Sequence, residues 1–143
     1  LLSVIKGDMN FIGPRPALFN QNKLITSAIS VGIGGLGIAL SKMAIASQKG
    51  LKVNLSNINI IDKKIDNNHI LFSESQSRIV VTVNPSIKSR FENYFKKNQL
   101  SLIGKIIKSK KIVCMMCNKD EFEVDISSLN NKYKQDLFNW WEL

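Results

Sequence analysis

The chain has 143 residues, of which 44% are hydrophobic, which is enough for a single domain with a real core. Its formal net charge is +9, but 17 of the 20 basic residues are Lys spread along the chain, which predicts a solvated Lys-rich surface and no nucleic-acid partner. No stretch reaches the roughly 20 apolar residues of a membrane span, and the start lacks the apolar run of a signal peptide, so we expect a soluble cytoplasmic protein.

The pattern of apolar residues predicts an α+β fold, a mixed β-sheet with helices packed on it. In chain order we expect a strand at 24–31, a helix at 36–48 that is stopped by Gly50, a strand at 52–60 and a polar loop at 62–68. A strand at 78–83 follows, and then a helix that is capped by Ser86 and carries Tyr94 and Phe95 on its apolar face. We expect two further strands at 102–107 and 111–116, joined at 108–110, and a last helix from Ser127 or Ser128 with an apolar stripe from Leu129 to Trp140.

Two cysteines, Cys114 and Cys117, form a C-x-x-C pair that follows a strand-like run. A redox pair needs its first sulfur at a helix N-terminus, and a zinc site needs four ligands, whereas the chain has a single histidine, His69. We therefore expect reduced thiols in a strand and no metal site.

The stretch GIGGLG at 32–37 formally spells the G-x-G-x-x-G pattern of a phosphate-binding loop. The acid that would bind a ribose about 20 residues later is missing, since Asp62 is the nearest candidate and lies in the polar loop. Glycines at the start of a helix serve turn geometry and packing equally well. The residues alone leave both interpretations open.

The stretch LFSESQSRIVVTV at 71–83 resembles the L-F-x-E-S-Q-x-R-x-x-V-x-V segment of phosphoribosylformylglycinamidine synthase, the purine-biosynthesis ligase. SAISVGIGGL at 27–36 lies where this family has S-A-H-D-x-S-D-G-G-L. The resemblance covers residues 22–143 and is to the C-terminal, aminoimidazole-ribonucleotide-synthetase-like domain. It implies that Gly34 and Gly35 form a strand-to-helix turn and that the G-x-G-x-x-G spelling is accidental.

The resemblance also implies substrate-binding residues. Glu74, Ser75 and Gln76 match a triplet that contacts the ribonucleotide in the family, and Arg78 can pair a phosphate. The structural alternative is an ion pair of Glu74 with Arg78 at the strand entry, with Ser75 capping the loop. The family's His-Asp and Ser-Asp pairs are replaced by Ile29-Ser30 and Gly32-Ile33, so we expect no Mg²⁺ site at this turn.

The family's catalytic residues and its ATP and magnesium sites belong to N-terminal domains that the resemblance does not cover. We therefore expect no catalytic residue and no cofactor in this chain alone, with ATP and Mg²⁺ implied for the complete enzyme, and we interpret His69 as a loop histidine. The implied partners are the remaining ligase domains and the glutaminase subunit, and a homo-oligomer stays open. The alternative is a catalytically dead module that binds a phosphate-bearing ligand or a partner chain.

Residues 1–18, LLSVIKGDMNFIGPRPAL, resemble the L-L-N-V-L-K-G-D-M-S-x-x-G-P-R-P-A-L motif of bacterial sugar transferases. In that motif Arg15 is expected to face a phosphate. We therefore predict a short leader at 1–21 that is not an independent domain, followed by the purine-ligase-like domain at 22–143. A sugar-transferase remnant fused at this junction and a chance likeness are the two interpretations of the leader.

Overall fold

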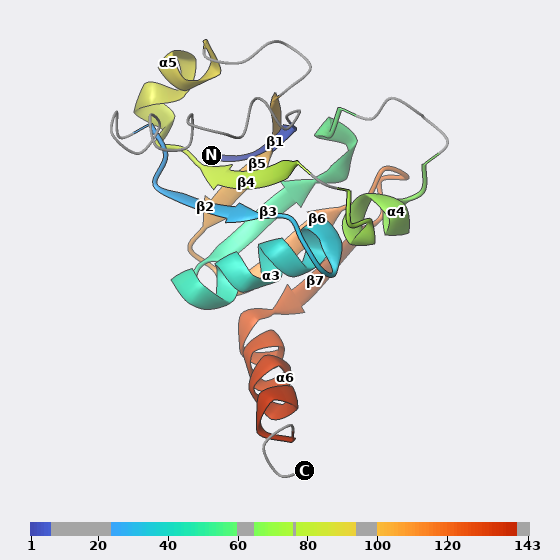
Figure 1. Ribbon diagram of the computed structural model, residues 1–143. Helices are drawn as coiled ribbons and strands as arrows, with labels where there is room; N and C mark the ends of the chain where they lie inside the picture. Colours follow the sequence, from blue (N-terminus) through green and yellow to red (C-terminus); the bar gives the residue numbers. More distant parts are fainter. Residues whose placement is uncertain (7–23, 60–64, 76, 94–99, 140–143) are drawn as a thin grey trace.

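The computed structural model describes residues 1–6, 24–59, 65–75, 77–93 and 100–139. Its strands form one mixed seven-stranded sheet in the order β2-β4-β1-β5-β3-β6-β7, in which β3 and β6 run parallel and the other neighbours antiparallel (Figure 1). The elements are β1 (Leu2–Lys6), β2 (Ser27–Ser30), α3 (Gly35–Ser47), β3 (Gly50–Asn54), α4 (Asn67–Phe72), β4 (Arg78–Thr82), α5 (Lys88–Glu92), β5 (Leu100–Ile107), β6 (Lys111–Met115), β7 (Glu121–Asp125) and α6 (Ile126–Asn139). The predicted α+β class is confirmed.

Strand β4 shows how the core is divided between the two faces of the sheet. Its side chains alternate, so Val80 joins the large core under α3 and α4, while Val81 joins a smaller cluster with Phe91 of α5. All three side chains are at most 2% exposed. This half of the sheet is therefore covered on both faces.

Helix α3 lies across the sheet in front of the central strands (Figure 1). Its buried side chains Leu36, Ala39, Leu40 and Ala44 recur at helical spacing and form the stripe that faces the core. The helix ends where Gln48 adopts a left-handed conformation with φ of 52°. The predicted helix is confirmed, but Gly50 is the first residue of β3 and not the helix stop.

Strands β5 and β6 are consecutive in the chain but are not paired, because β3 lies between them. The connection between them crosses the start of β3, where a Cβ on Gly50 would lie 2.1 Å from the carbonyl oxygen of Ser109 and 2.4 Å from that of Lys111. Only glycine leaves room for this crossing. The expectation of two adjacent strands joined at 108–110 is corrected to two strands separated by a third.

Strands β1 and β7 and helix α4 also depart from the expectations drawn from the sequence. Strand β1 pairs with β4 on one side and β5 on the other, so the first residues of the expected leader form a strand inside the sheet. Helix α4 begins within the segment expected to be a polar loop, and β7 forms the edge of the sheet beside β6.

Helix α5 is reached by a different route from the predicted one. A 3-10 turn, Pro85–Ile87, precedes the helix, and Asn84, not Ser86, caps this turn. Oδ1 of Asn84 accepts a hydrogen bond from the Ser86 amide at 3.1 Å. Phe91 is buried as expected, whereas Tyr94 and Phe95 lie outside the described residues.

Helix α6 extends away from the sheet after β7 (Figure 1). It begins at Ile126, one residue before the predicted start, and packs Leu129 against the core, while Tyr133 is 49% exposed. Trp140 lies outside the described residues. Within the described parts of the chain, none of the helices is long and apolar enough to cross a membrane.

Candidate functional site

The start of helix α3 and the loop after helix α4 lie side by side. The amide of Gly34 donates a hydrogen bond to Oε1 of Glu74 at 2.9 Å, which joins residues 40 positions apart. Because a helix N-terminus carries unpaired amides and a partial positive charge, a carboxylate is stabilised there. The structure thus brings Gly34 of the predicted turn into contact with Glu74, the first residue of the predicted substrate triplet.

Gly35 allows this contact to be close. It is buried, its φ is +68°, and a Cβ at this position would lie 2.6 Å from the Leu71 carbonyl oxygen and 2.7 Å from the Phe72 carbonyl carbon. Both the left-handed backbone and the direct approach of α3 to the end of α4 therefore require glycine. Gly35 thus serves turn geometry and packing in this structure.

Arg78, at the first position of β4, closes the loop that carries the triplet. Its Nη2 donates to the carbonyl oxygen of Ser73 and, at 3.2 Å, to the Ser73 hydroxyl, while its Nε donates to the Ser75 carbonyl at 3.3 Å. Partial burial lowers the pKa of the Arg78 guanidinium from its usual value. Arg78 is therefore a loop-fixing residue in this structure.

The ion pair expected as a structural alternative is not formed within the described chain, because Glu74 bonds to the α3 turn and Arg78 to the loop carbonyls. The Ser75 hydroxyl is exposed and lies 3.3 Å from the Ser73 hydroxyl, so the loop is closed by Arg78 and not by a Ser75 cap. Gln76 and Arg15 lie outside the described residues, and their predicted roles stay predictions.

His69 lies on helix α4 and not in a loop. Its side chain is 75% exposed, and its Nδ1 lies 2.9 Å from Oδ1 of Asp66, the residue that caps the helix. The hydrogen bond from the His69 amide is the main cause that lowers the pKa of the Asp66 carboxyl. The pair of side chains therefore stabilises the start of α4.

The donor set of the turn does not fit a magnesium ion. Ile29 is half-buried against the core, Ile33 is 87% exposed, and the remaining polar side chain of the two replaced pairs is the Ser30 hydroxyl. Mg²⁺ needs carboxylate oxygens, and no three His, Cys, Asp or Glu residues of the described segments are grouped to hold a metal. The turn itself therefore offers backbone amides and one hydroxyl, and the carboxylate that reaches it is that of Glu74.

The two thiols have different surroundings. Cys114 is buried on β6, and burial raises its pKa to about 11, so it is neutral near pH 7. Cys117 is exposed beyond the strand, in the turn to β7, where its amide donates to Oδ1 of Asn67 at 2.9 Å. Both are free cysteines in this structure.

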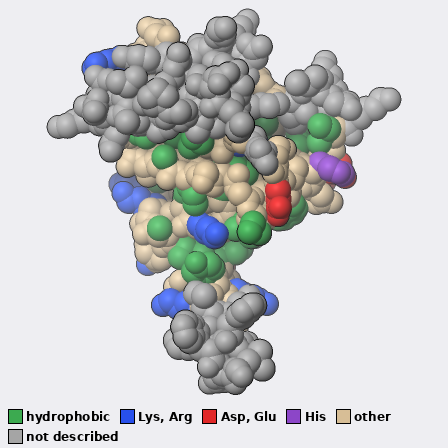
Figure 2. Space-filling view, in the orientation of Figure 1, with side chains coloured by type: hydrophobic (Ala, Val, Ile, Leu, Met, Phe, Trp, Pro, Cys, Tyr) green, Lys and Arg blue, Asp and Glu red, His purple; other side chains and the backbone are tan. Residues whose placement is uncertain are grey.

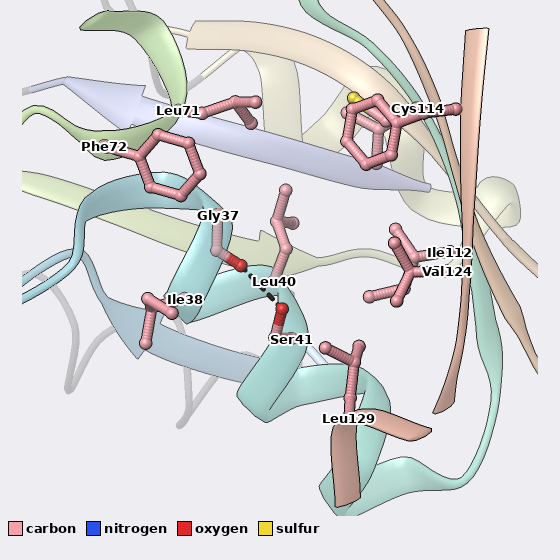
Figure 3. Close-up of a pocket in the computed structure, with 12 residues that line it drawn as sticks. Gly37, Ile38, Leu40, Ser41, Leu71, Phe72, Ile112, Cys114, Val124 and Leu129 are labelled. Atoms are coloured by element: carbon pink, nitrogen blue, oxygen red, sulfur yellow. Dashed lines mark hydrogen bonds between the residues drawn. The ribbon is translucent and has the colours of Figure 1, made fainter. Parts of the chain in front are cut away.

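An apolar cavity of about 230 Å³ lies next to the turn, and the sequence gives no sign of it (Figure 3). It is bounded by α3, the end of α4, strands β3, β6 and β7, and the start of α6. Its lining comes from segments far apart in the chain, so no local pattern signals it. On the outer surface near this region, hydrophobic side chains are exposed and the basic side chains are scattered (Figure 2).

Comparison with known proteins gives a consistent result. A protein-family model described as "AIR synthase related protein, C-terminal domain" matches residues 9–117. The Lactobacillus helveticus phosphoribosylformylglycinamidine synthase subunit PurL is 32% identical over 114 residues, 80% of this chain and 14% of that protein.

Two solved structures of Thermotoga maritima PurL have the same fold. The protein complexed with ATP gives a TM-score of 0.77 at 22% identity over 91% of this chain and 25% of that chain. The structure named PurLQS gives a TM-score of 0.77 at 21% identity over 91% of this chain and 26% of that chain. The predicted resemblance to the purine ligase is confirmed, and the alternative of a catalytically dead interaction module is not favoured. This chain spans about a quarter or less of the length of these relatives.

Proposed function

Because the chain belongs to the family of AIR synthase related C-terminal domains, we propose that it acts as the C-terminal domain of a phosphoribosylformylglycinamidine synthase in purine biosynthesis. The complete reaction is the ATP- and glutamine-dependent amidation of formylglycinamide ribonucleotide. In this proposal the chain supplies a folded part of the enzyme and is inactive alone, while ATP and Mg²⁺ are bound by other domains.

The observation that carries the proposal is the contact between Glu74 and the Gly34 amide. The two sequence segments that resemble the purine ligase, 27–36 and 71–83, meet at this hydrogen bond.

We further propose that the loop of Glu74, Ser75 and Gln76, fixed by Arg78, contributes substrate contacts in the assembled enzyme. Three properties support this. Glu74 and Ser75 are exposed, their side chains offer an acid and a hydroxyl that suit a sugar or glycinamide, and Arg78 holds the loop backbone in place.

The proposed partners are the remaining ligase domains and a glutaminase, in the cytoplasm. The solved structure of PurLQS from T. maritima supports partners of this kind.

Reconstitution tests the proposal. The 143-residue chain would be co-expressed with a PurL that lacks its own equivalent of this domain, together with the glutaminase, and glutamine-dependent amidation would be measured. We expect activity only when the chain is present, retention with Gly32→Ala and loss with Gly35→Ala. A folded chain that joins the complex without restoring activity would contradict the proposal.

The substrate loop is tested within the same reconstituted enzyme by Glu74→Gln. We expect a higher KM for formylglycinamide ribonucleotide and an unchanged KM for ATP. An equal change in both constants would indicate a structural role for Glu74 only.

A further inference from the structure

The cavity beside helix α3 lies on the side of the sheet opposite to α5 and is separate from the Glu74 contact. Ile112 of β6, Val124 of β7 and Leu129 of α6 point into the space across from the α3 side chains (Figure 3). Ile38 and Phe72 also line it and are 39% and 54% exposed, so they lie at its mouth. The cavity is therefore open to solvent beside these two side chains.

Small residues on α3 leave this space open. Gly37 and Ser41 are one helical turn apart on the side of α3 that faces the cavity. A Cβ on Gly37 would lie 3.2 Å from a ring carbon of Phe72, so glycine also brings that ring close to the helix. The cavity therefore lies between these small residues of α3 and strands β6 and β7.

The lining is unsuited to a charged ligand. Its polar side-chain groups are the Ser41 hydroxyl, which already donates to the Gly37 carbonyl at 2.9 Å, and the Cys114 thiol, which is neutral near pH 7. Burying an unpaired charge among apolar groups is strongly unfavourable. Two aromatic rings, Phe72 and Phe122, offer a face or an edge to a planar ligand.

The size of the cavity suits a small ring system. An apolar protein cavity of about 150 Å³ is sufficient to bind benzene. At about 230 Å³, the cavity in this protein has room for one or two fused rings.

We propose that the cavity between α3, β6, β7 and α6 binds a small, uncharged, planar aromatic molecule that enters between Ile38 and Phe72. This inference concerns a second site and goes beyond the proposed part in purine biosynthesis. It does not depend on that function, because its test needs neither the ligase domains nor their substrates.

Indole is the probe for the test, added to the 143-residue chain with ¹³C-labelled methyl groups and followed by NMR. We expect saturable shifts confined to the methyls of the lining residues, Ile112, Val124 and Leu129 foremost, and no shifts for Leu24 and Val81 of the second core cluster. This map is obtained on the unmodified chain. Absence of saturable shifts up to the solubility limit of indole, or shifts centred on the second cluster, would overturn the proposal.

A matched pair of variants locates the site. Val124→Phe places a ring inside the cavity, and Val113→Phe adds the same atoms on the opposite face of the adjacent strand β6. We expect binding of indole to weaken about tenfold or more in the first variant and to stay within about twofold in the second.

Equal weakening in both variants would contradict the assignment. If Val124→Phe does not fold, Ser41→Leu fills the same space from the α3 side, and retention of full affinity in the folded Ser41→Leu protein would likewise overturn the proposal.

Discussion

Helix α3 contacts its surroundings in two different ways along its length. At its start, backbone meets backbone, because Gly35 lies against the carbonyl groups of Leu71 and Phe72. Further along, the same helix faces β6 and β7 across a cavity of about 230 Å³. The first region leaves no room for one added carbon atom, whereas the second has room for several. Function is therefore expected to depend on exact geometry at the first region and on occupancy at the second.

The largest expected effect is at the tight contact. Gly35→Ala must place a Cβ within 3 Å of backbone atoms at a φ of +68°, and we expect the free energy of unfolding to fall by about 3 kcal/mol. Gly32→Ala is the matched control, because no atom beyond its two chain neighbours lies within 4 Å of its added Cβ, and it should change stability by less than about 0.5 kcal/mol. Urea denaturation measures both. Similar losses in the two variants would remove the distinction between the regions.

A second effect concerns the loop beside the tight contact. Arg78→Met removes the hydrogen bonds from the guanidinium to the Ser73 and Ser75 carbonyls, and we expect a loss of about 2 kcal/mol. Arg90→Met, at an exposed position of α5, serves as the control and should be nearly neutral. An unchanged free energy of unfolding for Arg78→Met, measured by urea denaturation, would show that the loop does not need its arginine.

At the cavity, an added side chain is expected to raise the stability of the protein instead of lowering it. Val124→Phe fills part of the cavity, and we expect the protein to become more stable by about 1 kcal/mol. Thermal unfolding with and without urea detects a change of this size. Destabilisation by Val124→Phe comparable to that of Gly35→Ala would mean that the second region is packed as tightly as the first.

The smallest effect is at the cap of α4. The pKa of Asp66 is lowered in the folded protein, so its stabilising contribution is present above the usual value of 3.8 and is lost as the pH falls through the lowered value. In the Asp66→Asn variant, the free energy of unfolding should therefore fall slightly less between pH 5 and pH 2 than in the unmodified protein. Above pH 5 the variant should lack only the contribution of the carboxylate charge. Unfolding curves from pH 2 to pH 7 compare the two proteins, and identical slopes would contradict the assignment.

The sequence predicts the elements that carry a strong local signal. The run RIVVT is apolar on both faces and is a doubly covered strand, and the apolar stripe of 36–48 is a helix. The E-S-Q segment and the glycine turn are each recognisable in the sequence, but their contact through Glu74 and Gly34 is not, because a hydrogen bond between residues 40 positions apart leaves no local pattern.

Other elements escape prediction for physical reasons. Helix α4 has six residues and too few apolar side chains to show a period, although Asp66 is a recognisable cap. Strand β7 presents two apolar side chains, Phe122 and Val124, and β1 lies in a stretch interpreted as a leader. The cavity depends on what neighbouring segments do not fill, and this property belongs to the assembled fold.

The insertion of β3 between β5 and β6 has a consequence for how the chain reaches its structure. Two strands that follow one another in the chain can pair rapidly as a hairpin. In this sheet, a hairpin of β5 with β6 would exclude β3 from its place between them. The sheet must instead close by joining segments 51 to 61 residues apart, which raises the contact order and slows folding. If a hairpin of β5 with β6 formed first, it would have to open before β3 could take its place between them.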